Sequence, residues 1–205
     1  MEEIQAIQTV YNGYRFRSRL EARWAVFFDA MNIDYRYEPE GFWNEVEYLD
    51  GDTVKKQTFY YLPDFYLPES NTWVEVKGNA KELMEDNEKM TWMLDFVSPL
   101  PHFHESFGTK AGLLLLGDIP NPYGGYIVHP LIQHHEGLIR TYAHFTNAFL
   151  GNIGVLNNDY TADSGFSEYF WDTQVYFADG IFYSDDVKSA YLKARQARFE
   201  HGEKG

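Results

Sequence analysis

The sequence of 205 residues contains no cysteine, which excludes disulfide bonds and thiolate metal sites and is typical of proteins in a reducing cytosol. It contains no run of about 18 apolar residues, so we expect no membrane-spanning helix. The N-terminus has no apolar stretch behind a basic one, which predicts no secretory signal. Basic residues are scarce, with 17 Lys and Arg against 31 Asp and Glu. We therefore expect a cytoplasmic protein whose surface as a whole does not attract nucleic acid.

The residues that are present can form a core and two local basic surfaces. Hydrophobic residues make up 44% of the chain and aromatic residues 18%, which excludes a disordered chain. The formal net charge of −14 is unevenly distributed, because residues 14–24 carry +3 and residues 187–199 carry +4. Both segments are candidates for local contact with phosphates, against a strongly acidic remainder.

Local patterns predict the order of the elements. Apolar residues at helical spacing predict a helix over residues 20–31, which Ser18 caps at its start and Asn32 ends. Strand patterns follow at residues 34–38, 41–52, 58–67 and 72–77, with a turn at Asp50-Gly51 in the second of them. A second apolar helix is predicted at residues 80–97 and a fully apolar strand at residues 111–116. This order predicts an α/β fold with a mixed β-sheet flanked by helices.

The chain divides into two parts by composition. We expect a core that ends near Gly117, followed by an acidic, aromatic-rich extension over residues 118–205. The sequence does not establish the order of the strands in this extension. The extension ends in a basic helix over residues 184–199.

The strands around the loop at residues 68–71 place three charged side chains on one surface. A four-residue loop sets a register in which Asp64 faces Glu75, with Lys77 on the same face as Glu75. Two carboxylates opposite each other repel, and a divalent cation with oxygen ligands offsets this repulsion. Pro63 indicates a bend that redirects Asp64. The simpler alternative is a surface hairpin in which Glu75 and Lys77 form a solvated pair.

Glu21 also has two interpretations. At the third position after Ser18, it has the spacing of a residue that helps to cap the helix. Alternatively, a carboxylate at the start of this helix reaches a metal at the edge of the sheet.

Three segments taken together resemble a known family. Phe16-Arg-Ser-Arg-Leu-Glu21 opens a helix, Leu62-Pro-Asp-Phe65 follows two strands, and Trp73-Val-Glu-Val-Lys-Gly78 comes next. This order is similar to that of the PD-(D/E)XK nuclease superfamily, and especially to the phage-type Holliday-junction resolvases. A group of phage and actinobacterial proteins resembles the chain in the same segments. The resemblance covers about residues 11–117 and implies a restriction-endonuclease-like fold for this part, which the C-terminal extension follows.

The resemblance implies an activity and assigns roles. The expected activity is metal-dependent, endonucleolytic hydrolysis of DNA phosphodiester bonds. The residues of these segments do not distinguish DNA from RNA as the substrate. Asp64 and Glu75 would be catalytic metal ligands, with the Val76 carbonyl as a third ligand. Glu21, also catalytic, would bind a metal or hold its water shell, and Lys77 would position or activate the attacking water and steady the phosphate. Hard oxygen ligands favour Mg²⁺ or Mn²⁺.

The basic segments and the extension predict the partners. The residues expected to contact DNA phosphates are Arg15, Arg17, Arg19, Lys188, Arg195 and Arg198. A second copy of the chain is a further candidate partner, as is a protein that binds the acidic extension. The alternative function is a non-catalytic interaction protein or DNA mimic that acts through this extension.

Overall fold

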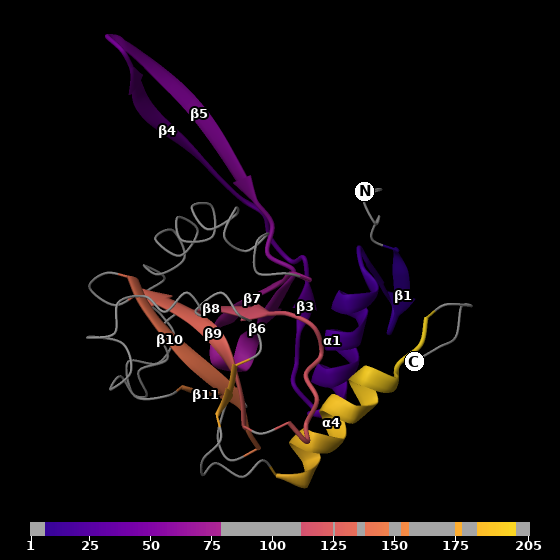
Figure 1. Cartoon of the computed structure of the whole chain (residues 1–205). Coiled ribbons are helices and arrows are strands. Elements are labelled where there is room, and N and C mark those ends of the chain that lie inside the picture. The colour runs from indigo at the N-terminus through magenta and orange to yellow at the C-terminus, as the bar shows by residue number, and fades with distance from the viewer. Residues whose placement is uncertain are drawn as a thin grey trace, which may run out of the picture.

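The computed structural model describes residues 7–78, 112–124, 126–134, 138–147, 153–155, 175–177 and 184–199 (Figure 1). The elements in these ranges are β1 (Thr9–Tyr11), β2 (Tyr14–Phe16), α1 (Arg19–Ala30), β3 (Arg36–Tyr37), β4 (Phe42–Asp50), β5 (Thr53–Tyr61), β6 (Phe65–Leu67), a 3-10 turn (Pro68–Ser70), β7 (Thr72–Val76), β8 (Gly112–Leu116), β9 (Tyr126–His134), β10 (Leu138–Phe145), β11 (Ile153–Val155), β12 (Val175–Phe177) and α4 (Asp185–Gln196). No helix in these ranges is long and apolar enough to span a membrane. The helix predicted over residues 80–97 lies outside them.

The main sheet is mixed, as the sequence predicted. Its strand order is β11-β10-β9-β8-β7-β6-β3, and β12 pairs with β9. β7 and β8 run parallel, whereas the other neighbouring pairs are antiparallel. The predicted α/β class is therefore confirmed.

The sheet continues past Gly117 without interruption. Every residue of β8 is buried, as expected for a fully apolar strand. β9, which follows Gly117 in the sequence, pairs with β8. The first strands of the acidic extension thus belong to the same sheet as the candidate core. The division of the chain into a core and an extension stays a prediction.

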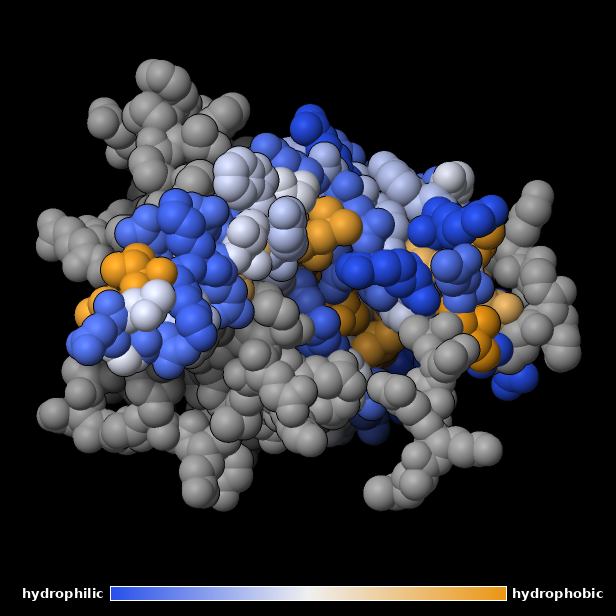
Figure 2. Space-filling model, turned by 90° about the horizontal axis from the view of Figure 1, so that it is seen from above, coloured by the Kyte–Doolittle hydropathy of each residue, from blue (hydrophilic) through white to orange (hydrophobic). Residues whose placement is uncertain are grey.

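A separate two-stranded sheet projects from the body. β4 and β5 pair over their whole length, and the turn between them lies at Gly51 and Asp52, with Gly51 at a φ of 63°. Figure 1 shows this hairpin as a long arm directed away from the main sheet and from helices α1 and α4. Figure 2 looks down from the side to which the arm points and shows hydrophobic residues among hydrophilic ones on the described surface.

Helix α1 begins and ends as predicted. The Ser18 side chain accepts a hydrogen bond from the Glu21 N–H, and Asn32 has a φ of 55° directly after the C-terminal Met31. The Glu21 carboxylate accepts from Arg17 N–H instead of returning to Ser18. The helix therefore has half of a capping box, and Glu21 points towards the preceding residues.

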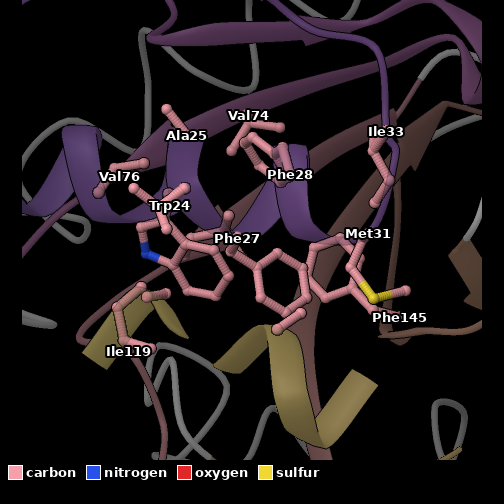
Figure 3. Close-up of a cluster of buried hydrophobic side chains, with 14 of the residues drawn as sticks. Trp24, Ala25, Phe27, Phe28, Met31, Ile33, Val74, Val76, Ile119 and Phe145 are labelled. Carbon is pink, nitrogen blue, oxygen red and sulfur yellow. The ribbon is translucent and has the colours of Figure 1, made fainter. Parts of the chain in front are cut away.

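The core lies between one face of the sheet and helices α1 and α4. Figure 3 shows Trp24, Phe27 and Phe28 of α1 packed beside Val74, Val76 and Phe145 of the sheet. α4 packs against α1 through its buried side chains at Val187, Ala190, Tyr191 and Ala194. The predicted basic helix thus has a buried apolar side that faces the core.

Helix α4 is shorter than the sequence predicted. It ends at Gln196, and Ala197 adopts an extended conformation with ψ at 127°. The turn out of the helix lets Phe199 pack edge-on against Tyr11, with ring centroids 6.0 Å apart. Arg198 consequently lies outside the helix, and the prediction that the helix extends to residue 199 is wrong.

Candidate active site

The register of the hairpin formed by β6 and β7 is the predicted one. Phe65 pairs with Val74 and Leu67 pairs with Thr72, so each pair has the offset that the loop length required. Phe65, Leu67 and Val74 face the core, as expected from the alternation of side chains. The candidate residues of the hairpin therefore belong to the opposite face, away from Phe65, Leu67 and Val74.

The regular pairing ends one residue before Asp64 would face Glu75. The chain bends at Asp64, as Pro63 indicated, and the Asp64 N–H donates to the Val74 carbonyl at 3.0 Å. The Val76 N–H donates to Asp64 Oδ2 at 2.7 Å. The carboxylate of Asp64 thus takes the place of a backbone acceptor and is fixed beside the end of β7.

Glu75 is buried and bonded at both oxygens. Lys77 Nζ lies 3.0 Å from Glu75 Oε1, and the Tyr61 hydroxyl donates to Glu75 Oε2 at 2.7 Å. The Glu75 side chain is 4% exposed, so the alternative of a solvated surface pair is wrong. Tyr61 comes from β5, at the base of the projecting arm, and nothing in its sequence spacing pointed to this contact.

Glu21 is held by a second tyrosine. The Tyr37 hydroxyl donates to Glu21 Oε2 at 2.6 Å, and Arg17 N–H donates to the same oxygen at 3.0 Å. Tyr37 lies in β3, the strand that pairs with β6, so the sheet aligns Tyr37 with the start of α1. Both candidate glutamates therefore accept a hydrogen bond from a phenol that sequence reasoning did not assign to the site.

Arg17 connects the start of α1 to the hairpin. Its Nη2 lies 2.7 Å from Asp64 Oδ1 and its Nε lies 2.6 Å from Glu38 Oε1. Glu38 is a further residue of the site that the sequence analysis missed. In this structure the guanidinium predicted to contact DNA is paired with two carboxylates, one of which is a candidate metal ligand.

The carboxylates of the site repel one another. Burial raises the pKa of Asp64 well above its ordinary value, and the nearby charges of Glu75 and Glu21 raise it further. The Val76 N–H and Arg17 act in the opposite direction and only partly compensate. A buried group of acids with an unfavourable net charge is an arrangement that an added cation stabilises.

The remaining predicted DNA-contacting residues are spread over two regions. Arg15 is exposed in β2, and Arg19 is the first residue of α1. On α4, Lys188 is partly exposed, and Arg195 Nη1 donates to the Ile119 carbonyl at 2.7 Å. Arg195 therefore ties α4 to the segment after β8.

The chain was compared with family models, curated proteins and solved structures, and none of them matches it. Within the described ranges, no three His, Asp or Glu side chains are gathered closely enough to hold a metal ion by themselves. Asp64, Glu75 and Glu21 form an electrostatically coupled group whose oxygens are held by Arg17, Lys77 and the two tyrosines.

The raised pKa of Asp64 predicts how its removal changes stability with pH. In metal-free protein, Asp64→Asn eliminates a buried charge, and the amide oxygen still accepts from Val76 N–H. An acid whose pKa is raised by folding favours the folded state below its unfolded pKa, and this contribution is lost as pH rises through the folded pKa. The unfolding free energy of Asp64→Asn, relative to the parent, should therefore increase from acidic to neutral pH.

This expectation is measured by urea unfolding at several pH values in the presence of a chelator. Asp52→Asn, which removes an exposed acid in the turn of the arm, is the matched control. A difference between parent and Asp64→Asn that stays constant or shrinks with rising pH contradicts the electrostatic description of the site.

Proposed function

We propose that the chain is a metal-dependent nuclease that hydrolyses DNA phosphodiester bonds within the strand, and that its sheet is of the restriction-endonuclease-like type. The observation that carries the proposal is the buried pair Asp64 and Glu75, with Lys77 ion-paired to Glu75 at the end of β7. Glu21, which is also buried, adds a third carboxylate from the start of α1.

A purely structural role does not account for this group. Buried acids that repel one another lower stability unless a partner compensates, and Asp64 keeps a raised pKa in spite of Arg17 and Val76 N–H. Perturbed acids of this kind concentrate at functional sites. A protein that only mimics DNA has no need of a lysine beside two buried carboxylates.

The donor set suits a hard divalent cation. Asp64, Glu75 and Glu21 offer carboxylate oxygens, and these are ligands that Mg²⁺ and Mn²⁺ accept. When bound, the cation would acidify a water molecule and neutralise charge on the phosphodiester. Because the guanidinium of Arg17 lies on Asp64 Oδ1, metal binding there requires Arg17 to move or to share this oxygen.

The residues of the chain have distinct roles in this proposal. Lys77 holds a positive charge where negative charge develops on the phosphate, and its pairing with Glu75 fixes its direction. Tyr61 and Tyr37 orient Glu75 and Glu21 through their hydroxyl groups, as positioning residues. Arg17 pairs with Asp64 in the free protein, and once released it would be close enough to the site to contact a phosphate.

The test is a cleavage assay on linear, nicked, branched and single-stranded DNA, and on RNA, with Mg²⁺ or Mn²⁺. We expect at least one DNA form to be cut at internal positions, with no cutting in the presence of a chelator. Calorimetric titration of Mn²⁺ should show binding that Asp64→Asn abolishes. If no substrate on this panel is cut and no metal binding is measured, the proposal is refuted.

Removal of the Tyr61 hydroxyl should weaken the site without unfolding the protein. Tyr61→Phe keeps the ring and eliminates the 2.7 Å hydrogen bond to Glu75, which leaves the carboxylate less well oriented. Residues that orient a metal ligand through a hydrogen bond are worth about 10- to 100-fold in metal affinity or activity. Mn²⁺ calorimetry and the cleavage rate measure the effect.

Tyr60→Phe is the matched control, since Tyr60 is the preceding residue of β5 and its side chain is exposed. Equal metal affinity and cleavage rate for the Tyr61 and Tyr60 variants would remove Tyr61 from the site.

A further inference from the structure

The arm formed by β4 and β5 leaves large apolar side chains in solvent. Trp43 and Tyr60 at its base are 64% and 72% exposed, and Leu49 and Val54 near its tip are 72% and 59% exposed. An isolated two-stranded hairpin is only marginally stable in water, and its outer backbone edges remain open to another chain. A surface of this kind indicates a binding partner.

All four side chains lie on the same face of the arm. Trp43 pairs with Tyr60 and Leu49 pairs with Val54, and the residues of both pairs have the same parity along their strands. Between these apolar pairs, the same face carries Glu45, Glu47 and Lys56, with Lys56 Nζ 2.5 Å from Glu45 and 3.3 Å from Glu47. The face thus has an apolar pair at each end and charges of both signs in the middle.

The charge of the arm argues against nucleic acid as its partner. Residues 42–61 contain four carboxylates, at Glu45, Glu47, Asp50 and Asp52, and two lysines, at Lys55 and Lys56. A net negative arm repels phosphates, whose binding depends on clustered Lys and Arg.

We propose that the arm binds a second copy of the same chain, face to face. Because the apolar pairs lie at both ends, two such faces match apolar to apolar whichever way the second arm runs. When both arms run in the same direction, Lys56 lies over Glu47 of the second copy, so that unlike charges meet. This proposal is independent of the nuclease function.

The size of the arm sets the expected strength of the dimer. Strands of nine residues span about 30 Å, and a two-stranded face of this length buries less than the roughly 800 Å² per partner of a standard interface. We therefore expect a reversible equilibrium between monomer and dimer. Sedimentation velocity on the full chain, from micromolar to near-millimolar concentration, should show the weight-average mass rising towards twice that of the monomer.

Two lysine substitutions test which face is used. Leu49→Lys places a charge in the apolar end of the proposed interface and should weaken association at least about tenfold. Tyr48→Lys alters the neighbouring residue on the opposite face, where Tyr48 is 45% exposed, and should leave association unchanged. Equal effects of the two substitutions contradict the assignment of the face.

A charge-reversal pair gives a result that loss of folding cannot imitate. Lys56→Glu makes the middle of the face entirely acidic, whereas Glu47→Lys makes it predominantly basic, so each variant alone should stay monomeric. An equimolar mixture of the two should form heterodimers, because acidic faces then meet basic ones. A chain that stays monomeric at every concentration, or a mixture that does not associate, overturns the proposal.

Discussion

Glu75→Gln is expected to lower the rate of metal-dependent DNA cleavage by about three orders of magnitude while the protein stays folded. The loss of one group that stabilises charge in a transition state lowers the rate about 10²- to 10³-fold. In the proposal, Glu75 both binds the metal and orients Lys77. The amide has nearly the same size as the carboxylate and still accepts from the Tyr61 hydroxyl. Single-turnover cleavage with saturating Mn²⁺ measures the effect.

Stability distinguishes this catalytic explanation from a structural one. The charge of Glu75 raises the pKa of Asp64, so its removal relieves repulsion in the buried group and should not lower the melting temperature by more than a few degrees. Glu69→Gln, which removes an exposed acid in the loop of the same hairpin, is the matched control and should cut at the parent rate. Full activity of Glu75→Gln would refute the assignment of Glu75.

The parts of the site that the sequence predicted are local ones. The number of residues in the loop after Leu67 determines the register of β6 and β7, and Pro63 marks the bend at Asp64. Ser18 determines the first turn of α1 and so places Glu21. Each of these predictions depends on residues within a few positions of one another, where backbone geometry leaves few alternatives.

The contacts that the sequence did not predict depend on how separate elements pack. Tyr61 reaches Glu75 from the base of the arm, although β5 is not a neighbour of β7 in the sheet. Arg17 looked like a phosphate contact because its segment is basic, but packing turns it towards Asp64 and Glu38. Pattern and spacing carry no information on which of several basic residues will meet a buried acid.

Trp24→Ala is expected to be strongly destabilising, with a loss of about 3–5 kcal/mol in the free energy of unfolding. Trp24 is fully buried in α1, and its ring packs edge-on against Phe27 and against His129, with centroids 5.3 and 5.5 Å away. Its Nε1–H donates to the Gly117 carbonyl at 2.7 Å. The substitution therefore leaves both a cavity and a buried carbonyl without its donor.

The position of Trp24 explains why this loss should affect the whole fold. The indole joins α1 to the end of β8 and also contacts Tyr191 of α4, so it links both helices to the sheet. Urea unfolding followed by circular dichroism measures the loss, with Tyr123→Ala, at an exposed aromatic residue, as the control expected to change stability by less than about 0.5 kcal/mol. Because a domain is stabilised by only about 5–15 kcal/mol, Trp24→Ala should remove a large part of the total. A loss no larger than that of Tyr123→Ala would show that α1, α4 and the sheet do not share this core.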